Sequence, residues 1–174
     1  MTGVQTCALP ICCYGGVPFP IPKSGVEAIW NHLLRVESEA TEVSNFKNII
    51  LTSDGSRAMA TMNDQSNQYP YYYKDGSADK WSGEYFLQRF STIAPPFKAG
   101  ESLVFRDSTN LSQARQAWQY LVGQRRVRRA PTVAYDTPDF VASGANYFDE
   151  VMGLMGQDRK SVVLGKECPR CVDL

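Results

Sequence analysis

The sequence predicts a mainly β domain with one packed helix, an α+β protein whose sheet is antiparallel. Short β-prone segments follow one another from residue 45 to residue 130, and turn-forming pairs such as Asp54-Gly55 and Asp75-Gly76 separate them. One segment near the start carries apolar residues at helical spacing. The spacing of the β-prone segments is typical of antiparallel strands and not of β-α-β units.

The expected helix follows a proline-rich stretch, residues 15–22. Each proline fixes its own φ and disfavours a helical residue before it, so this stretch is extended. Ser24 and Glu27 then have the spacing of a capping box, which predicts a helix start. An apolar stripe on this helix should cover a sheet, and its members are Val26, Ile29, Trp30, Leu33 and Leu34.

The β-prone half begins near Asn45. Asp54-Gly55 favours a hairpin turn, because both central residues of a type I′ turn need positive φ. The aromatic segment 69–73 is a further β-prone run, and residues 122–124 form a short glycine-containing loop. Past residue 130 the sequence is loop-like, and another element is expected to begin within 149–155. We expect strands at residues 46–52, 57–63, 84–93, 101–106, 114–121 and 125–130.

The composition is that of a single globular domain. Hydrophobic residues make up 43% and aromatic residues 11% of the chain. Because 18 basic residues balance 18 acidic ones, the net charge favours no class of partner. The sequence contains no apolar run of about 18 residues, so no transmembrane segment is expected.

Both ends of the chain match translated sequencing-library adapters. Residues 1–11 are the codon-by-codon translation of one adapter, and residues 158–174 follow from its companion. We therefore expect genuine protein only at 12–157, as a partial, truncated domain from inside a longer protein. The two adapter-derived tails are expected to adopt no consistent structure.

The same reasoning removes an apparent metal site. Cys168 and Cys171 have zinc-ligand spacing, and Cys7, Cys12 and Cys13 lie near the other end. Four of the five cysteines belong wholly or partly to the tails, and neither a second CxxC pair nor a pair of histidines accompanies them. We predict no metal site and no cofactor.

No set of catalytic residues is expected either, so we predict that the protein is not an enzyme. His32 is the single histidine and lies on the polar side of the predicted helix. The nucleophile-elbow, zinc-protease and phosphate-loop motifs do not occur. Several carboxylates cluster late in the chain, but their spacing matches no calcium loop, and we interpret them as solvated: Asp136, Asp139, Asp149 and Glu150.

The sharpest charge feature is the segment 125–129. On a strand, Arg126 and Arg128 would share one face, and Arg125 and Arg129 the other. These guanidinium groups could bind an anion or an acidic partner protein. The alternative interpretation is a charged edge strand that resists aggregation. Nucleic acid is not an expected partner, because the balanced charge offers no second basic stripe.

Aromatic side chains are distributed over the helix and several strands. An antiparallel sheet that curls around one helix can leave an apolar concavity large enough for an acyl chain. The alternative is an ordinary, filled core. The residues expected to line such a groove are Val26, Ile29, Trp30, Leu33, Leu34, Tyr85, Phe90 and Trp118.

Several segments resemble the bacterial family called domain of unknown function 1329, or DUF1329, which is described as outer-membrane lipoprotein-sorting-like. The resemblance covers almost everything between Tyr14 and Gly156. The matching segments are residues 15–25 (GGVPFPIPKSG), 29–35 (IWNHLLR), 69–72 (YPYY), 94–96 (APP), 117–121 (AWQYL), 123–131 (GQRRVRRAP) and 134–136 (AYD).

This resemblance implies a fold similar to the LolA/LolB lipoprotein carriers, an incomplete antiparallel half-barrel with a helix packed in its mouth. It also implies a periplasmic location and an outer-membrane or efflux-type transport partner, and it assigns no catalytic residue. We therefore expect a binding domain that carries or senses a lipid, an acyl chain or a lipidated protein. An interaction scaffold for a transport partner is the alternative.

Overall fold

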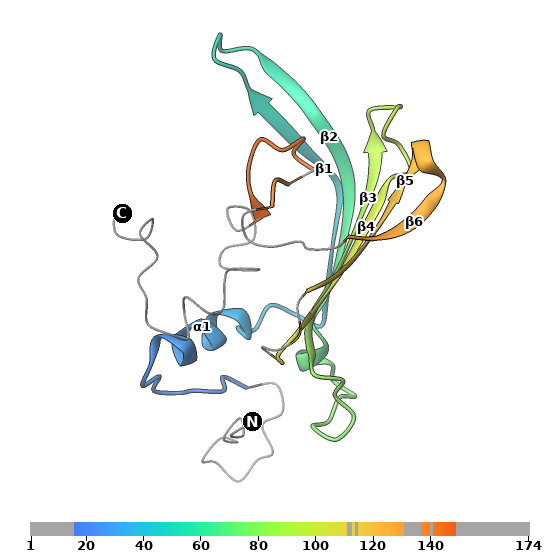
Figure 1. Ribbon diagram of the computed structural model, residues 1–174. Helices are drawn as coiled ribbons and strands as arrows, with labels where there is room; N and C mark the ends of the chain where they lie inside the picture. Colours follow the sequence, from blue (N-terminus) through green and yellow to red (C-terminus); the bar gives the residue numbers. More distant parts are fainter. Residues whose placement is uncertain (1–15, 111–112, 114, 131–136, 140, 149–174) are drawn as a thin grey trace.

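The computed structural model describes residues 16–110, 113, 115–130, 137–139 and 141–148 (Figure 1). Six strands form one antiparallel sheet in sequential order, and one α-helix precedes them. The elements are α1 (Gly25–Leu33), β1 (Ala40–Leu51), β2 (Arg57–Gln68), the 3-10 turn η1 (Pro70–Tyr72), β3 (Glu84–Ala94), β4 (Ser102–Ser108), β5 (Gln116–Leu121), the 3-10 turn η2 (Val122–Gln124) and β6 (Arg126–Ala130). The mainly β, α+β class predicted from the sequence is confirmed, with an open sheet whose outer strands are β1 and β6.

The start of helix α1 is capped as its sequence predicts. The Ser24 hydroxyl accepts a hydrogen bond from the Glu27 amide at 3.3 Å. The Glu27 carboxylate accepts one from the Lys23 amide at 2.5 Å, one residue before the expected position. These contacts satisfy backbone donors that the first helical turn leaves without partners.

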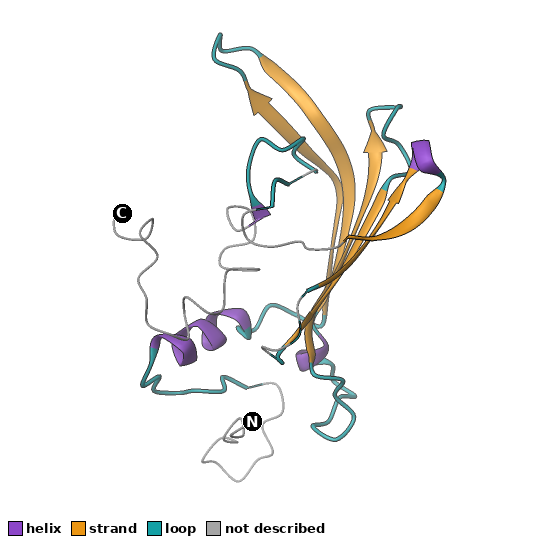
Figure 2. Cartoon of the chain, viewed as in Figure 1, coloured by secondary structure: helices purple, strands orange, loops and turns teal. Residues whose placement is uncertain are grey.

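Strands β1 and β2 are longer than predicted. Each has 12 residues, and β1 begins at Ala40 while β2 continues to Gln68. Their register shifts between Val43 and Phe46 and again between Asn48 and Ile49. Such bulges bend a strand pair and increase its twist, and the β1–β2 hairpin is visibly curved (Figure 2). The C-terminal half of β2 is polar and has low β propensity, which is why the predicted strand ended at residue 63. Pairing with β1 and β3 nevertheless keeps this half in the strand conformation.

The segment 69–73 was predicted as a β-prone run, and this prediction is wrong. Residues Pro70–Tyr72 form a 3-10 turn, in which the Tyr72 amide donates to the Tyr69 carbonyl at 2.8 Å. Proline fits the first position of such a turn because its missing N–H has no partner there anyway. The turn ends strand β2 and places Tyr71 in a buried aromatic cluster.

Helix α1 and the segment 137–148 lie on the same, concave side of the sheet (Figure 1). The helix packs through Trp30 and Leu33 against the buried side chains of Tyr85 and Phe86. The other segment packs through Val141 and Phe148 against β3 and β4. These two contacts leave space between them on the concave face. The expected element within 149–155 and both adapter-derived tails lie outside the described residues.

A buried ion pair joins strand β4 to the residues before β5. Arg115 Nε and Nη2 each donate to an Asp107 carboxylate oxygen at 2.8 Å, and the two side chains are 4% and 1% exposed. The Arg115 guanidinium also lies 5.2 Å from the centre of the Phe105 ring. Desolvation lowers the Arg115 pKa, but the hydrogen bonds and charge of Asp107 outweigh it, so the pKa is raised.

Candidate functional site

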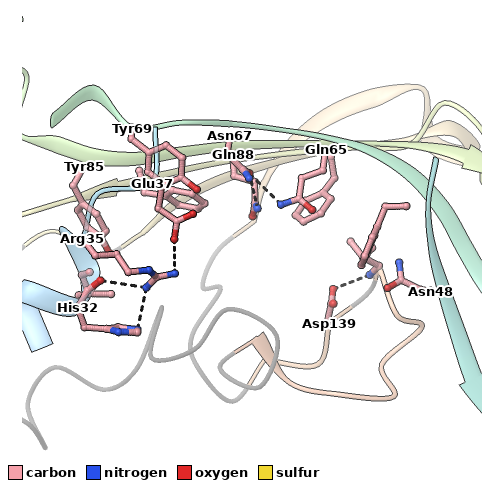
Figure 3. A pocket seen from close by; sticks show the side chains of 15 residues that line it. His32, Arg35, Glu37, Asn48, Gln65, Asn67, Tyr69, Tyr85, Gln88 and Asp139 are labelled. Atoms are coloured by element: carbon pink, nitrogen blue, oxygen red, sulfur yellow. Dashed lines mark hydrogen bonds and ion pairs between the residues drawn. The ribbon is translucent and has the colours of Figure 1, made fainter. Parts of the chain in front are cut away.

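A cavity of about 510 Å³ lies on the concave face between the end of helix α1, strands β1 to β3 and the segment 137–148. Its volume is within the range of ~300–1,000 Å³ typical of small-molecule sites. Figure 3 shows Arg35 and His32 at one end of this cavity and Asp139 with Asn48 at the other. Between these ends, the wall is aromatic and the sheet surface is rich in amides.

Aromatic rings form the apolar part of the lining. Tyr85 and Phe86 belong to the cluster beneath helix α1, and Phe90 belongs to the cluster beneath the segment 137–148. Tyr69 packs on Phe86 with ring centres 5.5 Å apart. The Phe46 ring on β1 is 38% exposed. The cavity therefore continues the core and presents apolar surface that the described residues do not fully cover.

Side-chain amides form the polar part of the lining. Gln65 Nε2 and Gln88 Nε2 both donate to Asn67 Oδ1, at 3.2 and 2.9 Å. Asn67 Nδ2 donates in turn to the Thr41 hydroxyl at 3.0 Å. These side chains meet because Asn67 is registered with Thr41 on β1 and with Gln88 on β3, and directly paired residues share a face.

One atom of this network has no partner. Gln88 is 3% exposed, and its Oε1 is buried without a hydrogen bond from any residue that the structure describes. A buried acceptor of this kind is unusual, because most buried polar atoms are paired. An unused acceptor therefore lies in the wall of the cavity, buried where its aromatic and amide surfaces meet.

Charged groups mark the two ends of the cavity. Arg35 Nη2 lies 2.5 Å from Glu37 Oε1, and Arg35 Nη1 donates to the His32 carbonyl at 3.2 Å. At the other end, the Val141 amide donates to the Asp139 carboxylate at 2.9 Å. Burial raises the pKa of Asp139, although hydrogen bonds from the Val141 and Ala142 amides partly oppose this shift. Asp139 is 6% exposed, so the prediction of a solvated carboxylate is wrong for this residue.

A second set of hydrogen bonds fixes the segment 137–148 to the sheet. The Thr61 hydroxyl donates to the Val141 carbonyl at 2.5 Å. Asn63 Nδ2 and Asn48 Nδ2 donate to the same hydroxyl at 2.8 and 3.0 Å. Polar side chains at alternating positions of β2 thus hold one wall of the cavity in place.

Of the predicted groove residues, Leu33, Tyr85 and Phe90 line the cavity. Trp30 and Leu34 pack beside it in the cluster under the helix, where Trp30 meets Tyr85 edge to face at 5.8 Å. Val26 and Ile29 are half-buried on the helix and do not line the cavity.

Trp118 lies on the other face of the sheet. It is registered with Val104 and Arg129, whereas its neighbour Ala117 is registered with Phe105 and packs in the core. Because successive side chains of a strand point to opposite faces, Trp118 cannot join a groove on the concave face. Its inclusion in the expected groove is therefore corrected.

Arg126 and Arg128 were predicted to lie on one face of a strand and Arg129 on the other, and the register of β6 agrees. Arg126 and Arg128 are registered with Leu121 and Gln119, and Arg129 with Trp118. Arg125 precedes the strand, with a left-handed φ of 49°. All four arginines are exposed on the sheet edge, and within the described residues none of them forms an ion pair.

Sequence reasoning missed the amide surface, although a signal was present. Polar residues occupy alternate positions of β2, namely Thr61, Asn63, Gln65 and Asn67, which is the period of one strand face. Apolar periodicity does not reveal a buried face of this kind, because its side chains are polar. Within the described ranges, no group of three metal-ligating side chains occurs, and no helix is long and apolar enough to cross a membrane.

The fold is an open antiparallel sheet with a helix on its concave face, and the site is a cavity of mixed aromatic and amide character. Comparison with known families shows to which family the chain belongs. The family model described as "Protein of unknown function (DUF1329)" matches residues 3–160, which begins nine residues before the expected range 12–157 and ends three residues after it. The chain belongs to the DUF1329 family.

Two relatives support this assignment. The chain is 34% identical over 137 residues to "Uncharacterized protein PA3922" of Pseudomonas aeruginosa, a match that covers 76% of the chain and 29% of that protein. A crystal structure of a DUF1329 family protein from Desulfovibrio piger superposes with a TM-score of 0.52 at 14% identity. That match covers 76% of the chain and 51% of the solved one, so it shows a shared fold. The chain thus spans less than two thirds of each relative.

Proposed function

We propose that this domain is a non-enzymatic periplasmic binding module that holds a lipid, an acyl chain or a lipidated protein in the concave cavity. The observation that carries the proposal is the cavity of about 510 Å³ with aromatic rings along its wall. The resemblance of the sequence to the lipoprotein-sorting-like family, and through it to the LolA/LolB carriers, supports the periplasmic location and the class of ligand.

The physical basis is the removal of apolar surface from water. Burial contributes about 25 cal/mol per Å², so an acyl chain that loses ~200 Å² of apolar surface would gain about 5 kcal/mol. Ordering of the ligand and its loss of translational freedom offset part of this gain. Affinity would therefore be moderate, which suits a module that releases its ligand to a partner.

Native mass spectrometry of the chain purified from cells tests the proposal. We expect a co-purified amphiphile that organic solvent releases. Gln65→Phe places a ring in the cavity and should abolish this adduct, because Gln65 lines the cavity. Ser66→Phe, on the opposite face of the same strand, should retain it. If the unmodified chain carries no such adduct, and if added lipids do not bind to it either, the proposal is refuted.

The exposed arginines of strand β6 favour a second candidate function, an interaction scaffold for an outer-membrane or efflux-type transport partner. Their charges are unpaired in the described part of the chain, and β6 is an edge strand. An acidic protein surface would complement them. Double charge reversal, Arg126→Glu with Arg128→Glu, should abolish partner binding by a scaffold and leave lipid binding by a carrier unchanged.

A further inference from the structure

We infer that the ligand of the cavity carries a neutral hydrogen-bond donor beside its apolar chain, and that Gln88 Oε1 accepts this hydrogen bond. The inference rests on the proposed function and specifies the chemistry of the ligand. Its basis is the unpartnered acceptor of a side chain that is 3% exposed and lines the cavity.

The amide network fixes which atom of Gln88 remains unused. Gln88 Nε2 donates to Asn67 Oδ1 at 2.9 Å, and Gln65 Nε2 donates to the same oxygen. Rotation of the Gln88 amide alone would place Oε1 against Asn67 Oδ1, two acceptors in contact. In this arrangement of the hydrogen bonds, Oε1 is the free atom of the Gln88 amide and remains for a donor from outside the network.

The surroundings of Gln88 select a donor attached to an apolar group. Phe86 and Phe90 occupy the next positions on the same face of β3, and both line the cavity. Gln88 Oε1 is already shielded from water before a ligand binds, and a ligand whose chain covers these rings would keep water away from it. An acceptor left dry and unpaired is unfavourable, so a ligand with a donor at this point is preferred over one without it.

The charges of the lining favour a neutral donor over an ammonium group. Glu37 is already paired with Arg35, and Asp139, which accepts a hydrogen bond from the Val141 amide, lies toward the far end of the cavity from Arg35 and away from Gln88 (Figure 3). A buried cation without its own counter-ion is strongly disfavoured. Amide N–H and hydroxyl groups meet the requirement, and both occur beside acyl chains.

Calorimetric titration of the full chain with three matched amphiphiles tests the inference. The probes are N-dodecylacetamide, which has an N–H donor, 1-dodecanol, which has an O–H donor, and dodecyl acetate, which has none. We expect at least one donor-bearing probe to bind about tenfold more tightly than the ester. The probe that binds more tightly identifies the donor as an amide or a hydroxyl.

Gln88→Leu assigns the preference to its acceptor. This variant should bind all three probes with affinities within about twofold of one another, and Gln119→Leu, on β5 outside the cavity, should retain the preference. If the ester binds the unmodified chain as tightly as the donor-bearing probes, the inference is wrong and the proposed function stands. If none of the probes binds, both are wrong. Comparison of the probes on the unmodified chain decides the inference even where Gln88→Leu does not fold.

Discussion

Removal of Asp107 should destabilise the protein more than any exposed ion pair could. Its carboxylate is 1% exposed and receives two hydrogen bonds of 2.8 Å from Arg115, whose side chain is 4% exposed. Asp107→Ala would leave the Arg115 guanidinium buried without a counter-ion. Among the residues that the structure describes, Arg115 Nη1 has no hydrogen-bond partner, so few of them remain to stabilise the charge.

Breaking a buried pair by removing one partner costs about 3–5 kcal/mol, and we expect a loss in this range for Asp107→Ala. Glu84 and Arg106 form the matched control, because Arg106 is adjacent to Asp107 on β4, on the opposite face, and is 51% exposed. Arg106→Ala should cost less than about 1 kcal/mol. Replacing both partners of the buried pair, as Asp107→Leu with Arg115→Met, should restore stability to within about 1 kcal/mol of the unmodified chain.

Urea unfolding followed by circular dichroism would measure these free energies, and Asp107→Leu, Arg115→Met and the variant that combines them form a double-mutant cycle. Because removal of either partner should cost about 3–5 kcal/mol and the double variant about 1 kcal/mol or less, the cycle should give a coupling free energy of at least about 5 kcal/mol. A loss below about 1 kcal/mol for Asp107→Ala, or a coupling near zero, would show that water reaches the pair and that the described packing around Phe105 is wrong.

Three further predictions concern single residues. Burial raises the pKa of Asp139, so the ionised carboxylate opposes folding and stability falls as pH rises through that pKa. Asp139→Asn should remove this dependence and be the more stable form at pH 7 in urea unfolding, whereas an unchanged pH slope would contradict the assignment. The hydroxyl groups of Thr52 and Ser56 and the Ser56 amide lower the pKa of Asp54 to about 2, so its stabilising effect is present above pH 3.8 and is lost as pH falls toward 2. A carbon-detected NMR titration should show this value, and a midpoint near 3.8 would exclude the turn hydrogen bonds. Trp30→Ala removes the edge-to-face contact with Tyr85 and should cost about 2–3 kcal/mol because the ring is only half-buried. Amide exchange in helix α1 should then accelerate, and unchanged exchange would mean that the helix does not depend on this contact.

The secondary structure was largely predictable because its signals are local. The capping residues Ser24 and Glu27 indicated the start of helix α1, and Asp54-Gly55 indicated the first hairpin. The predicted type I′ turn is wrong, because Gly55 has a φ of 81° but Asp54 does not have a positive φ. The ends of β1 and β2 were not predictable in this way. Their polar residues are held by pairing with neighbouring strands, and such long-range contacts leave no local pattern.

The site was predictable only in part. Leu33, Tyr85 and Phe90 could be assigned to a groove because apolar periodicity identifies the buried face of a helix or strand. Trp118 was assigned to the wrong face, since a shift of one residue in register reverses every side chain of a strand. The network of Gln65, Asn67 and Gln88 depends on the register between β2 and β3, which no single segment encodes.

Side-chain amide NMR tests the central claim most directly, because the proposed ligand contacts would occur at nitrogen-bearing side chains. Addition of N-dodecylacetamide should shift the side-chain NH₂ resonances of Gln65, Asn67 and Gln88, which line the cavity, and leave that of Gln116 on β5 unchanged. Resonances that stay in place at saturating probe, or shifts confined to the arginines of β6, would contradict a ligand-binding cavity on the concave face.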